Sequence, residues 1–456
     1  MFKPDQPIER VKDDLLGTGP FARALGEAVL KYTSKESMVI ALYGPWGSGK
    51  TSIVNMALEH IGNISKEETD KPIIMRFNPW NFSEQNQLIL QFFGQLSNLL
   101  NRPDWAGDFK KAGKRLKLYA DCLRPLAIIP IPVVGQAAAT IASSLDKIGD
   151  TYQKVGKSKS EDLASLKNEL ANILRKQHRK IIVVIDDIDR LNLVEIRQIF
   201  QLVKCLGDFP NTVYLLAFDK GVVTGALKGE QGDLGEKYLE KVVQVPFEIP
   251  LADRQEIERL LFSQLDQLIG DIPEERWEQV YWGNIYHSGL KYFFNSIRDV
   301  TRYINSLRLS FEMVKGEVNA IDFLAITGLQ VFLPDIYAGI RDNKDIFAGA
   351  SRDRGGQTQR DEERKRCDDI LNKGTTVEQD QLRDFMKRLF PRLEAVYGGA
   401  NYGSNWLDNW RKAGRICSPD IFDTFFRLSL PKNEISQKEI LRILSTAKDE
   451  MAFIAL

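Results

Sequence analysis

The sequence has 456 residues and a mass of 51.9 kDa, which is more than one ordinary hydrophobic core accommodates, so two domains are expected. Hydrophobic residues make up 43% and charged residues 27%, a balance typical of globular, water-soluble proteins. The 62 basic and 62 acidic residues give a formal net charge of zero, so no overall positive field draws the protein onto nucleic acid.

The cysteines and the N-terminal sequence bear on the cellular compartment. The N-terminus, MFKPDQPIERVKDD, lacks the apolar stretch of a secretory signal. The cysteines form no C-x-x-C pair, which argues against a zinc site and against a disulfide framework. We therefore predict a cytoplasmic protein whose scattered thiols are Cys122, Cys205, Cys367 and Cys417.

A glycine-rich motif follows the first apolar run of the chain. Met38–Tyr43 leads directly into G-P-W-G-S-G-K-T at Gly44–Thr51, and a stretch of helical periodicity follows. Strand, loop and helix in this order are typical of the phosphate-binding loop, or Walker A motif, of nucleoside triphosphatases. The predicted nucleotide-binding residues are Gly44, Pro45, Trp46, Gly47, Ser48, Gly49, Lys50, Thr51 and Ser52.

The residue types of this loop suit a triphosphate. Glycines let successive backbone N–H groups turn toward phosphate oxygens, and the following helix presents its positive end. Lys50 supplies a positive charge for the β- and γ-phosphates, and the Thr51 hydroxyl is a candidate Mg²⁺ ligand. Pro45 and Trp46 are expected mainly to shape the loop.

Further apolar runs alternate with helical stretches, as a parallel α/β sheet requires. Over residues 1–250 we therefore predict an α/β core, with strands at Met38–Tyr43, Pro72–Phe77, Lys180–Ile185, Thr212–Ala217 and Val242–Phe247.

An uncharged apolar segment interrupts this core. Residues 125–145 read PLAIIPIPVVGQAAATIASSL and are flanked by basic stretches, which suggests a membrane segment. One crossing would put the phosphate loop and the acidic strand described next on opposite sides of the membrane, and two crossings need about twice this length. We expect a shallow membrane contact, a partner-binding helix or a buried hairpin, within a helical insert of about residues 100–175.

The third run, KIIVVIDDIDRL, ends in adjacent carboxylates and is typical of a Walker B strand. Asp186 is the candidate Mg²⁺ ligand, and Asp187 is the candidate general base for an attacking water. A second acid favours hydrolysis over transfer to an acceptor. The alternative is that these acids only terminate the strand and pair with their own arginine.

The fourth run ends in VYLLAFDKGVV. If its strand lies between the Walker A and Walker B strands, its end points at the γ-phosphate and Asp219 is a candidate sensor of hydrolysis. The alternative is that Asp219 caps the helix that begins at Lys220.

Helical periodicity dominates residues 251–456, for which we predict a helical domain. In SIRDVTRYINSL, Arg298 and Arg302 lie four residues apart on one helical face. They could reach a triphosphate or form a solvated surface pair.

Together these segments resemble the KAP family of P-loop NTPases. The stretches that carry the resemblance are ALYGPWGSGKTSIVNM (Ala41–Met56), FNPWNFSEQNQL (Phe77–Leu88), VVIDDIDRL (Val183–Leu191), LLAFDKGVV (Leu215–Val223), YLEKVVQVPFEIPL (Tyr238–Leu251) and IRDVTRYINSL (Ile297–Leu307).

The resemblance implies a three-layer αβα core with an additional strand, the parallel order 5-1-4-3-2, and ATP with Mg²⁺ as ligands. It supports the roles suggested above and implies that Arg298 and Arg302 are nucleotide sensors and that Leu16 and Phe21 contact adenine. Many members carry membrane helices at the place of residues 125–145, where this sequence has one proline-broken run, so a location peripheral to the inner membrane stays open. Bacterial relatives often exclude or sense phage, which suggests a defence role.

Three functions compete. The first is an ATPase switch whose nucleotide state controls self-assembly or a protein partner. The second is a nucleotide-locked scaffold, with little turnover, that meets a partner or membrane through residues 125–145. The third is a nucleic-acid motor, which the neutral net charge disfavours, although five residues could form a local phosphate-binding face: Lys110, Lys111, Lys114, Arg115 and Lys117.

Overall fold

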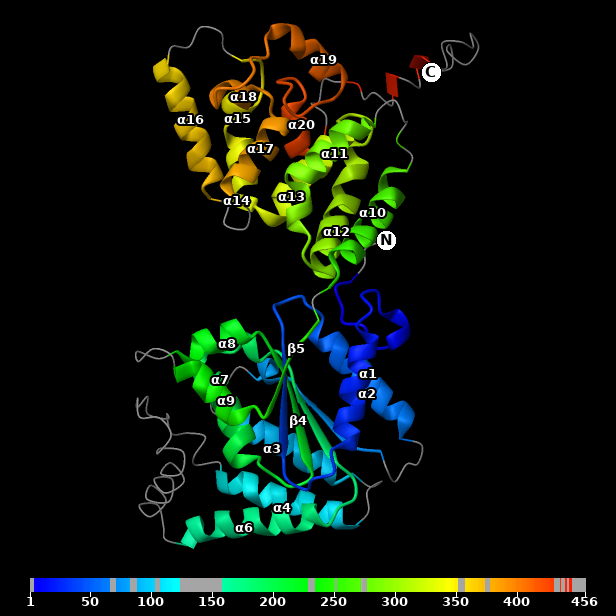
Figure 1. Cartoon of the computed structure of the whole chain (residues 1–456), viewed down its shortest axis with the longest axis vertical. Helices are drawn as coiled ribbons and strands as arrows, with labels where there is room; N and C mark the ends of the chain where they lie inside the picture. The colour runs from blue at the N-terminus through cyan, green and yellow to red at the C-terminus, as the bar shows by residue number, and fades with distance from the viewer. Residues whose placement is uncertain are drawn as a thin grey trace. The chain divides into compact units, whose positions relative to one another are not determined.

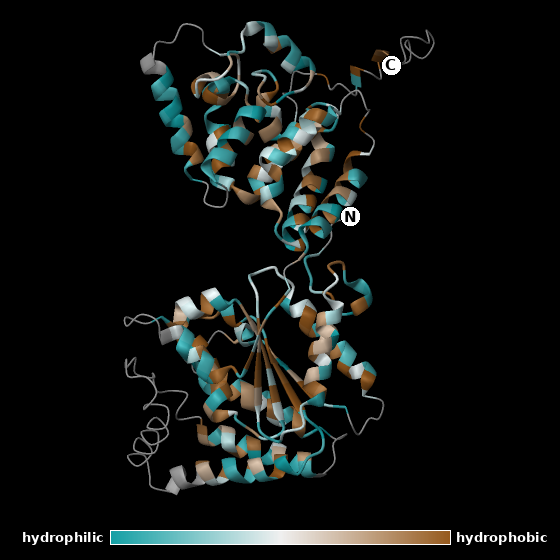
Figure 2. Cartoon of the chain, in the orientation of Figure 1, coloured by the Kyte–Doolittle hydropathy of each residue, from teal (hydrophilic) through white to brown (hydrophobic). Residues whose placement is uncertain are grey.

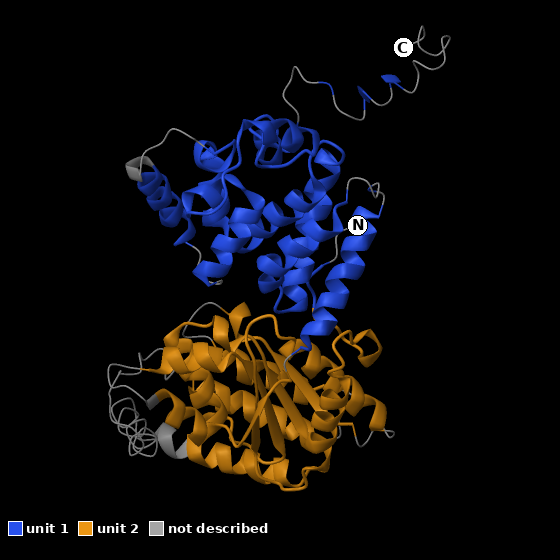
Figure 3. Cartoon of the chain, turned by 45° about the horizontal axis from the view of Figure 1, so that its top comes forward, with its two compact units in different colours: residues 1–6, 252–456 blue, residues 7–251 orange. Residues whose placement is uncertain are grey.

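The chain forms two compact units (Figure 1). One contains residues 7–251, and the other contains residues 1–6 and 252–456 (Figure 3). The computed structural model describes residues 4–65, 71–82, 88–102, 107–123, 158–228, 234–250, 252–270, 272, 277–351, 357–373, 378–429, 435, 439–440 and 443–444.

Parallel strands form the centre of the unit of residues 7–251. They are β1 (Met38–Tyr43), β2 (Ile73–Phe77), β3 (Ile181–Ile185), β4 (Thr212–Phe218) and β5 (Val245–Glu248). The order across the sheet is β5-β1-β4-β3-β2, with Ile40 opposite Leu215 and Val183 opposite Tyr214. This confirms the predicted order 5-1-4-3-2 and places β4 between β1 and β3.

Helices cover both faces of this sheet, which completes the predicted three-layer αβα core. Alternate side chains of a strand point to opposite faces, so Ala41 packs against one layer and Leu42 against the other. Burial on both faces explains why the central strands β1, β4 and β3 are almost uniformly hydrophobic (Figure 2). One layer contains α1 (Gly19–Lys31) and α2 (Lys50–Ile64), and the other contains α3 (Leu88–Leu100), α4 (Gly107–Leu123), α6 (Ser158–Arg175), α7 (Leu193–Gln201), α8 (Lys220–Leu227) and α9 (Leu234–Val242).

The predicted start of the fifth strand is wrong. The apolar run was expected to be extended from Val242, but the helix α9 continues through that residue and β5 begins at Val245. Leu239 and Val242 lie three residues apart, and both are buried in the helical layer. The run therefore divides between the apolar face of a helix and a short edge strand.

The parallel arrangement brings the strand ends to one edge of the sheet. Carboxyl ends of parallel strands lie side by side, and ligands of open α/β sheets bind outside this edge. Gly44 follows β1, Asp186 follows β3, and Asp219 follows β4. The candidate functional residues of this unit thus converge because of the topology.

The unit of residues 1–6 and 252–456 is built from helices. In α12, buried Val300, Ile304 and Leu307 form one face, as the helical periodicity predicts. The longer helices are α10 (Arg254–Ile269), α11 (Gln279–Ser288), α12 (Ile297–Val314), α13 (Ala320–Phe332), α14 (Pro334–Asp342), α16 (Gln357–Leu371) and α17 (Gln379–Leu389). Shorter ones are α15 (Lys344–Phe347), α18 (Arg392–Val396), α19 (Leu407–Lys412) and α20 (Phe422–Arg427).

A buried ion pair joins distant parts of this helical unit. Arg415 Nε donates to Asp322 Oδ2 at 2.8 Å, and the Asp322 side chain is fully buried. Tyr281 donates its hydroxyl to the other Asp322 oxygen, and the Ile416 N–H donates to Oδ2 at 2.8 Å. Through these hydrogen bonds the Asp322 carboxylate connects α13 with α11 and with the segment before α20.

Asp322→Ala is expected to destabilise the helical unit by about 3–5 kcal/mol, because it leaves the buried Arg415 charge without its partner. Chemical denaturation followed by tryptophan fluorescence would measure this loss. Asp408→Ala is the control, because it removes an exposed carboxylate that pairs with Arg411, and should change the free energy of unfolding by less than about 0.5 kcal/mol. Equal effects of the two substitutions would contradict the prediction.

The apolar segment of residues 125–145 lies outside the described residues. Within the part of the chain that the structure describes, no helix has both the length and the apolar character that a membrane crossing requires.

Candidate functional site

The phosphate loop leaves β1 and enters α2 through glycines that the geometry requires. A Cβ atom on Gly44 would lie 2.7 Å from the Ile249 side chain, so a larger residue would force a neighbouring side chain to move. Gly49, the residue before α2, has φ 90°, in the left-handed region that glycine adopts at little cost. Among the described residues, no side chain caps this helix, so its first N–H groups remain available to an anion.

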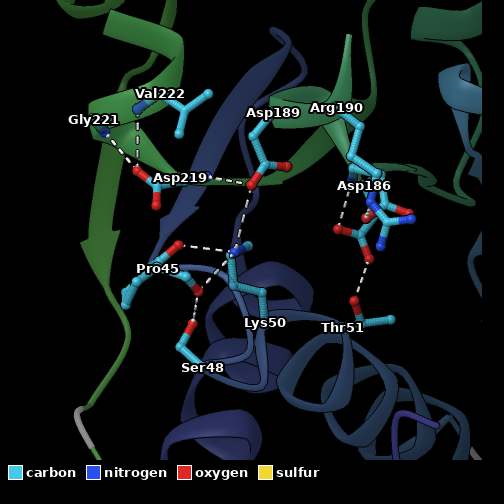
Figure 4. Close-up of polar contacts among 12 residues, drawn as sticks. Pro45, Ser48, Lys50, Thr51, Asp186, Asp189, Arg190, Asp219, Gly221 and Val222 are labelled. Carbon is cyan, nitrogen blue, oxygen red and sulfur yellow. Dashed lines mark hydrogen bonds and ion pairs between the residues drawn. The ribbon is translucent and has the colours of Figure 1, made fainter. Parts of the chain in front are cut away.

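Lys50 lies at the head of α2 with its ammonium turned back over the loop (Figure 4). Its Nζ donates to the carbonyl oxygens of Gly44 at 2.8 Å and Pro45 at 3.1 Å, and lies 3.9 Å from Asp189 Oδ2. The side chain is 8% exposed. A buried ammonium held by weak acceptors can exchange them for phosphate oxygens, which bind it more strongly.

Thr51 and Asp186 meet between α2 and the end of β3. The Thr51 hydroxyl donates to Asp186 Oδ2 at 2.6 Å, and the Asp187 N–H donates to Asp186 Oδ1 at 2.8 Å. Burial raises the pKa of the Asp186 carboxyl, while these two hydrogen bonds act to lower it. A hydroxyl and a carboxylate are the oxygen ligands that Mg²⁺ takes beside substrate phosphates and water.

This donor set fits Mg²⁺ bound together with a nucleotide better than it fits a metal held by protein alone. The described residues contain no group of three or more His, Cys, Asp or Glu side chains that could hold a metal ion. Mg²⁺ usually keeps several waters and needs only one or two carboxylates when phosphates complete its shell.

Asp186→Asn is expected to stabilise the nucleotide-free protein at neutral pH by roughly 0.5–2 kcal/mol. Because burial raises the folded-state pKa of this carboxyl, its ionised form destabilises the fold, and this cost disappears as the pH falls through that pKa. The asparagine oxygen can accept from the Asp187 N–H while its NH₂ group donates to the Thr51 hydroxyl oxygen, so the side chain keeps both contacts of the carboxylate.

Urea denaturation of both proteins at pH 7 and at lower pH would test this. The advantage of the Asp186→Asn variant should shrink toward low pH, where the wild-type carboxyl becomes neutral. A less stable variant at pH 7 would mean that the hydrogen bonds to the carboxylate outweigh its desolvation.

Asp187 is held by two different elements. Its φ is 59°, a left-handed conformation that is uncommon for a residue with a side chain and is often found at functional sites. Asn78, which follows β2, donates from Nδ2 to Asp187 Oδ2 at 2.9 Å. Arg190 places Nε 2.9 Å from Asp187 Oδ1, so the pairing of this acid with its own arginine does occur. The candidate role of Asp187 as general base stays a prediction.

Asp219 and Asp189 connect β4 with the phosphate loop. Asp219 Oδ1 accepts from the N–H groups of Gly221 at 2.8 Å and Val222 at 3.2 Å, so this residue caps α8 (Figure 4). The Asp219 N–H donates to Asp189 Oδ2 at 3.2 Å, and the same oxygen faces Lys50. Asp189 therefore links the Lys50 ammonium to the backbone at the end of β4. The sensor role of Asp219 stays a prediction.

The remaining predicted nucleotide residues lie around the same loop or at the start of the chain. Ser48 donates its hydroxyl to the Pro45 carbonyl oxygen at 2.6 Å, and Trp46 is 72% exposed. The Ser52 hydroxyl accepts from the Ile8 N–H at 3.2 Å, which joins the N-terminal segment to α2.

The two candidate adenine contacts are partly buried. Phe21 packs edge to face on Phe247, with ring centroids 6.1 Å apart. The Leu16 N–H donates to Asp14 Oδ1 at 3.1 Å, in the turn before α1. Whether either residue meets a base stays a prediction.

Arg298 and Arg302 belong to the helical unit. Arg298 forms an ion pair with Asp5, a residue of the same unit. Arg302 Nη2 donates to the Val331 carbonyl oxygen at 3.4 Å, and its guanidinium lies 6.0 Å from the Phe332 ring centroid. To act as a sensor, Arg298 would have to exchange Asp5 for a phosphate.

The basic face considered for nucleic acid lies on α4. Two of its residues have acidic partners: Lys111 pairs with Asp108 at 3.2 Å and Arg115 with Glu169 at 3.2 Å. These pairs reduce the positive charge available to a phosphate backbone.

Three residues of the site were not assigned from the sequence: Asn78, Asp189 and Arg190. Each directly follows or lies close to the end of a strand at the carboxyl edge, which is the signal that could have identified them. Asp189 is the third acid of the DDIDR stretch, and Asn78 opens the turn after β2.

Comparison with known proteins identifies a family. The family model described as KAP family P-loop domain matches residues 19–313. The Phage T7 exclusion protein of Escherichia coli (strain K12) is 23% identical over 354 residues, which are 73% of this chain and 46% of that protein. The chain therefore matches less than half of the length of this curated relative.

Solved structures also match the chain. The ORC2 protein of Aeropyrum pernix, in ADPNP-ADP complexes, has 12% sequence identity and a TM-score of 0.36 and covers 85% of this chain and 88% of its own. Cdc6p from Pyrobaculum aerophilum has 11% identity and a TM-score of 0.36 and covers 93% of this chain and 97% of its own.

Proposed function

The chain belongs to the KAP family of P-loop domains, and on this premise we propose that it binds ATP with Mg²⁺, hydrolyses the nucleotide and uses the cycle as a conformational switch. The observation that carries this proposal is the 2.6 Å hydrogen bond between Thr51 and Asp186 beside the Lys50 ammonium. These groups join the phosphate loop to the end of β3, as a site for a phosphate-bound divalent cation requires.

Each residue has one task in the proposed reaction. Lys50 and the N–H groups at the start of α2 bind the β- and γ-phosphates. Thr51 and Asp186 would hold Mg²⁺, which supplies positive charge to the phosphate oxygens. Asp187 accepts a proton from water while the water oxygen bonds to the γ-phosphorus. The bond from that phosphorus to the bridging oxygen breaks, and ADP leaves with the electron pair.

The contacts of Lys50 suggest how the nucleotide state could be transmitted. The ammonium faces both loop carbonyls and Asp189, and Asp189 accepts from the N–H of Asp219 at the start of α8. A triphosphate would draw the ammonium toward its own oxygens and so change the charge balance at Asp189. We propose that this change alters α8 and, through it, a surface for self-assembly or for a protein partner.

A nucleotide-locked scaffold is the second candidate, and one observation favours it. Both oxygens of Asp187 already have a donor, from Asn78 and Arg190, as in an ion pair that only stabilises a fold. A scaffold would bind ATP with the same loop and release little phosphate.

Turnover and particle size would separate these candidates. Phosphate release from ATP and from GTP would be measured with and without Mg²⁺, and light scattering would record particle size in each nucleotide state, with and without detergent. Mg²⁺-dependent turnover with a size change that depends on ATP is the result expected. Tight binding without turnover would support the scaffold, and turnover that requires DNA or RNA would revive the motor.

We also propose a role in bacterial defence against phage, in the cytoplasm or at the inner membrane surface. The support is the similarity to the Phage T7 exclusion protein. Plaque assays on bacteria that express the wild type or the Lys50→Ala variant would test it. Fewer plaques with the wild type alone are expected, and equal plaque numbers across a phage panel would contradict the role.

A further inference from the structure

The turn after β2 lies against the candidate general base. In this turn, Asn78 Oδ1 accepts from the Trp80 N–H at 3.0 Å, which fixes the orientation of the Asn78 amide. The Asn78 NH₂ group therefore points toward Asp187, to whose Oδ2 it donates at 2.9 Å.

The same turn reaches the other oxygen of Asp187 through an arginine. The Arg190 guanidinium lies 5.1 Å from the centroid of the Trp80 ring, and its Nε lies 2.9 Å from Asp187 Oδ1. Trp80 is 54% exposed, and the Arg190 guanidinium lies over the face of its ring. A cation over an indole face is held by the ring quadrupole.

Asn78 and the Arg190 guanidinium that packs on Trp80 thus contact different oxygens of Asp187 and fix the plane of its carboxylate. A carboxylate offers about four lone-pair positions, and one donor on each oxygen leaves room for a water. The side chains of this ion pair are 36% exposed for Arg190 and 23% exposed for Asp187. Ion pairs near the surface contribute only about 0–1 kcal/mol to stability, which is a weak reason to place a half-exposed tryptophan beside this one. Orientation of a base toward water is a stronger reason, because small displacements of a reacting group reduce rates steeply.

We propose that Arg190, held by the face of Trp80, is a positioning residue that orients Asp187 for activation of the attacking water. This inference rests on the proposed ATP hydrolysis. Arg190 acts through Asp187, and Trp80 acts through Arg190.

Steady-state kinetics of the full chain would test it with Arg190→Gln, Arg190→Lys, Trp80→Ala and Trp80→Phe. Arg190→Gln should lower kcat by about tenfold to hundredfold, with KM for ATP within about twofold. Trp80→Ala should lower kcat by about threefold to tenfold, and Trp80→Phe should restore most of it because the phenyl face also binds a cation. Lysine cannot reproduce the planar guanidinium, so Arg190→Lys should stay impaired.

The matched control is Arg259→Gln on α10. Arg259 pairs with Glu256 at 2.8 Å, also at a spacing of three residues, and is 67% exposed. Its substitution should leave kcat unchanged. Circular dichroism and titration with a fluorescent ATP analogue would show that each variant is folded and binds nucleotide.

A double-substitution cycle separates positioning from a structural role. In the Asp187→Asn background, Arg190→Gln should cause no further loss of kcat, because the group that it orients is already gone. An unchanged or raised kcat in Arg190→Gln, a loss that adds fully to that of Asp187→Asn, or a loss confined to KM would overturn the inference while the proposed hydrolysis stands. A wild type that shows no turnover would overturn the proposed function, and the inference would fall with it.

Discussion

Lys50→Ala is expected to weaken ATP binding by about 10²–10³-fold, because it removes the buried positive charge that the phosphate loop offers to the β- and γ-phosphates. The ammonium is 8% exposed and donates to two loop carbonyls, so it is already desolvated and aimed at the loop. Titration with a fluorescent ATP analogue would measure the loss, and phosphate release should fall with it.

The control for this substitution is Lys31→Ala. Lys31 is 76% exposed and pairs with Glu27 one helical turn away, so its removal should leave affinity unchanged within about twofold. Near-normal ATP affinity of the Lys50→Ala variant would contradict the assignment of the loop as the triphosphate site. Because the switch and the scaffold both need this site, the substitution tests binding without choosing between them.

The positions of the strands could be predicted from sequence because apolar runs are local signals. Apolar runs marked the strands, and the resemblance to a family gave their order, which the pairing of β1 with β4 and β5 confirms. The boundary at Val242 could not be predicted, because a short apolar run has the same sequence pattern at the end of an amphipathic helix as at the start of a strand.

The contacts of the site were harder to predict than its members. Glycine and lysine spacing identified the phosphate loop, and adjacent acids identified the end of β3. That Asp189 faces Lys50, or that Asn78 reaches Asp187, depends on the neighbouring positions of β1, β2, β3 and β4 and on side-chain rotamers. Sequence spacing carries neither kind of information.

Asp187→Asn is expected to lower kcat by about 10²–10⁴-fold while ATP affinity changes by less than about threefold. The substitution removes the group that accepts the proton of water and leaves Lys50, Thr51 and Asp186 in place to bind the nucleotide. Phosphate release and analogue titration on the same preparation would give the two quantities.

Asp187→Asn also changes hydrogen bonds, so its effect on stability must be measured separately from its effect on turnover. Asp187 accepts from Asn78 on one oxygen and from Arg190 on the other, so an asparagine must turn its NH₂ group toward one of these donors. A modest loss of stability is therefore expected, and urea denaturation of the same preparation separates this loss from the loss of a base. If Asp187→Asn retains the turnover of the wild type, Asp187 is only an acceptor in an ion pair, and its assignment as the general base is contradicted. If turnover is lost while binding persists, the second acid of the DDIDR stretch works as a base, and the ion pair with Arg190 serves to aim it.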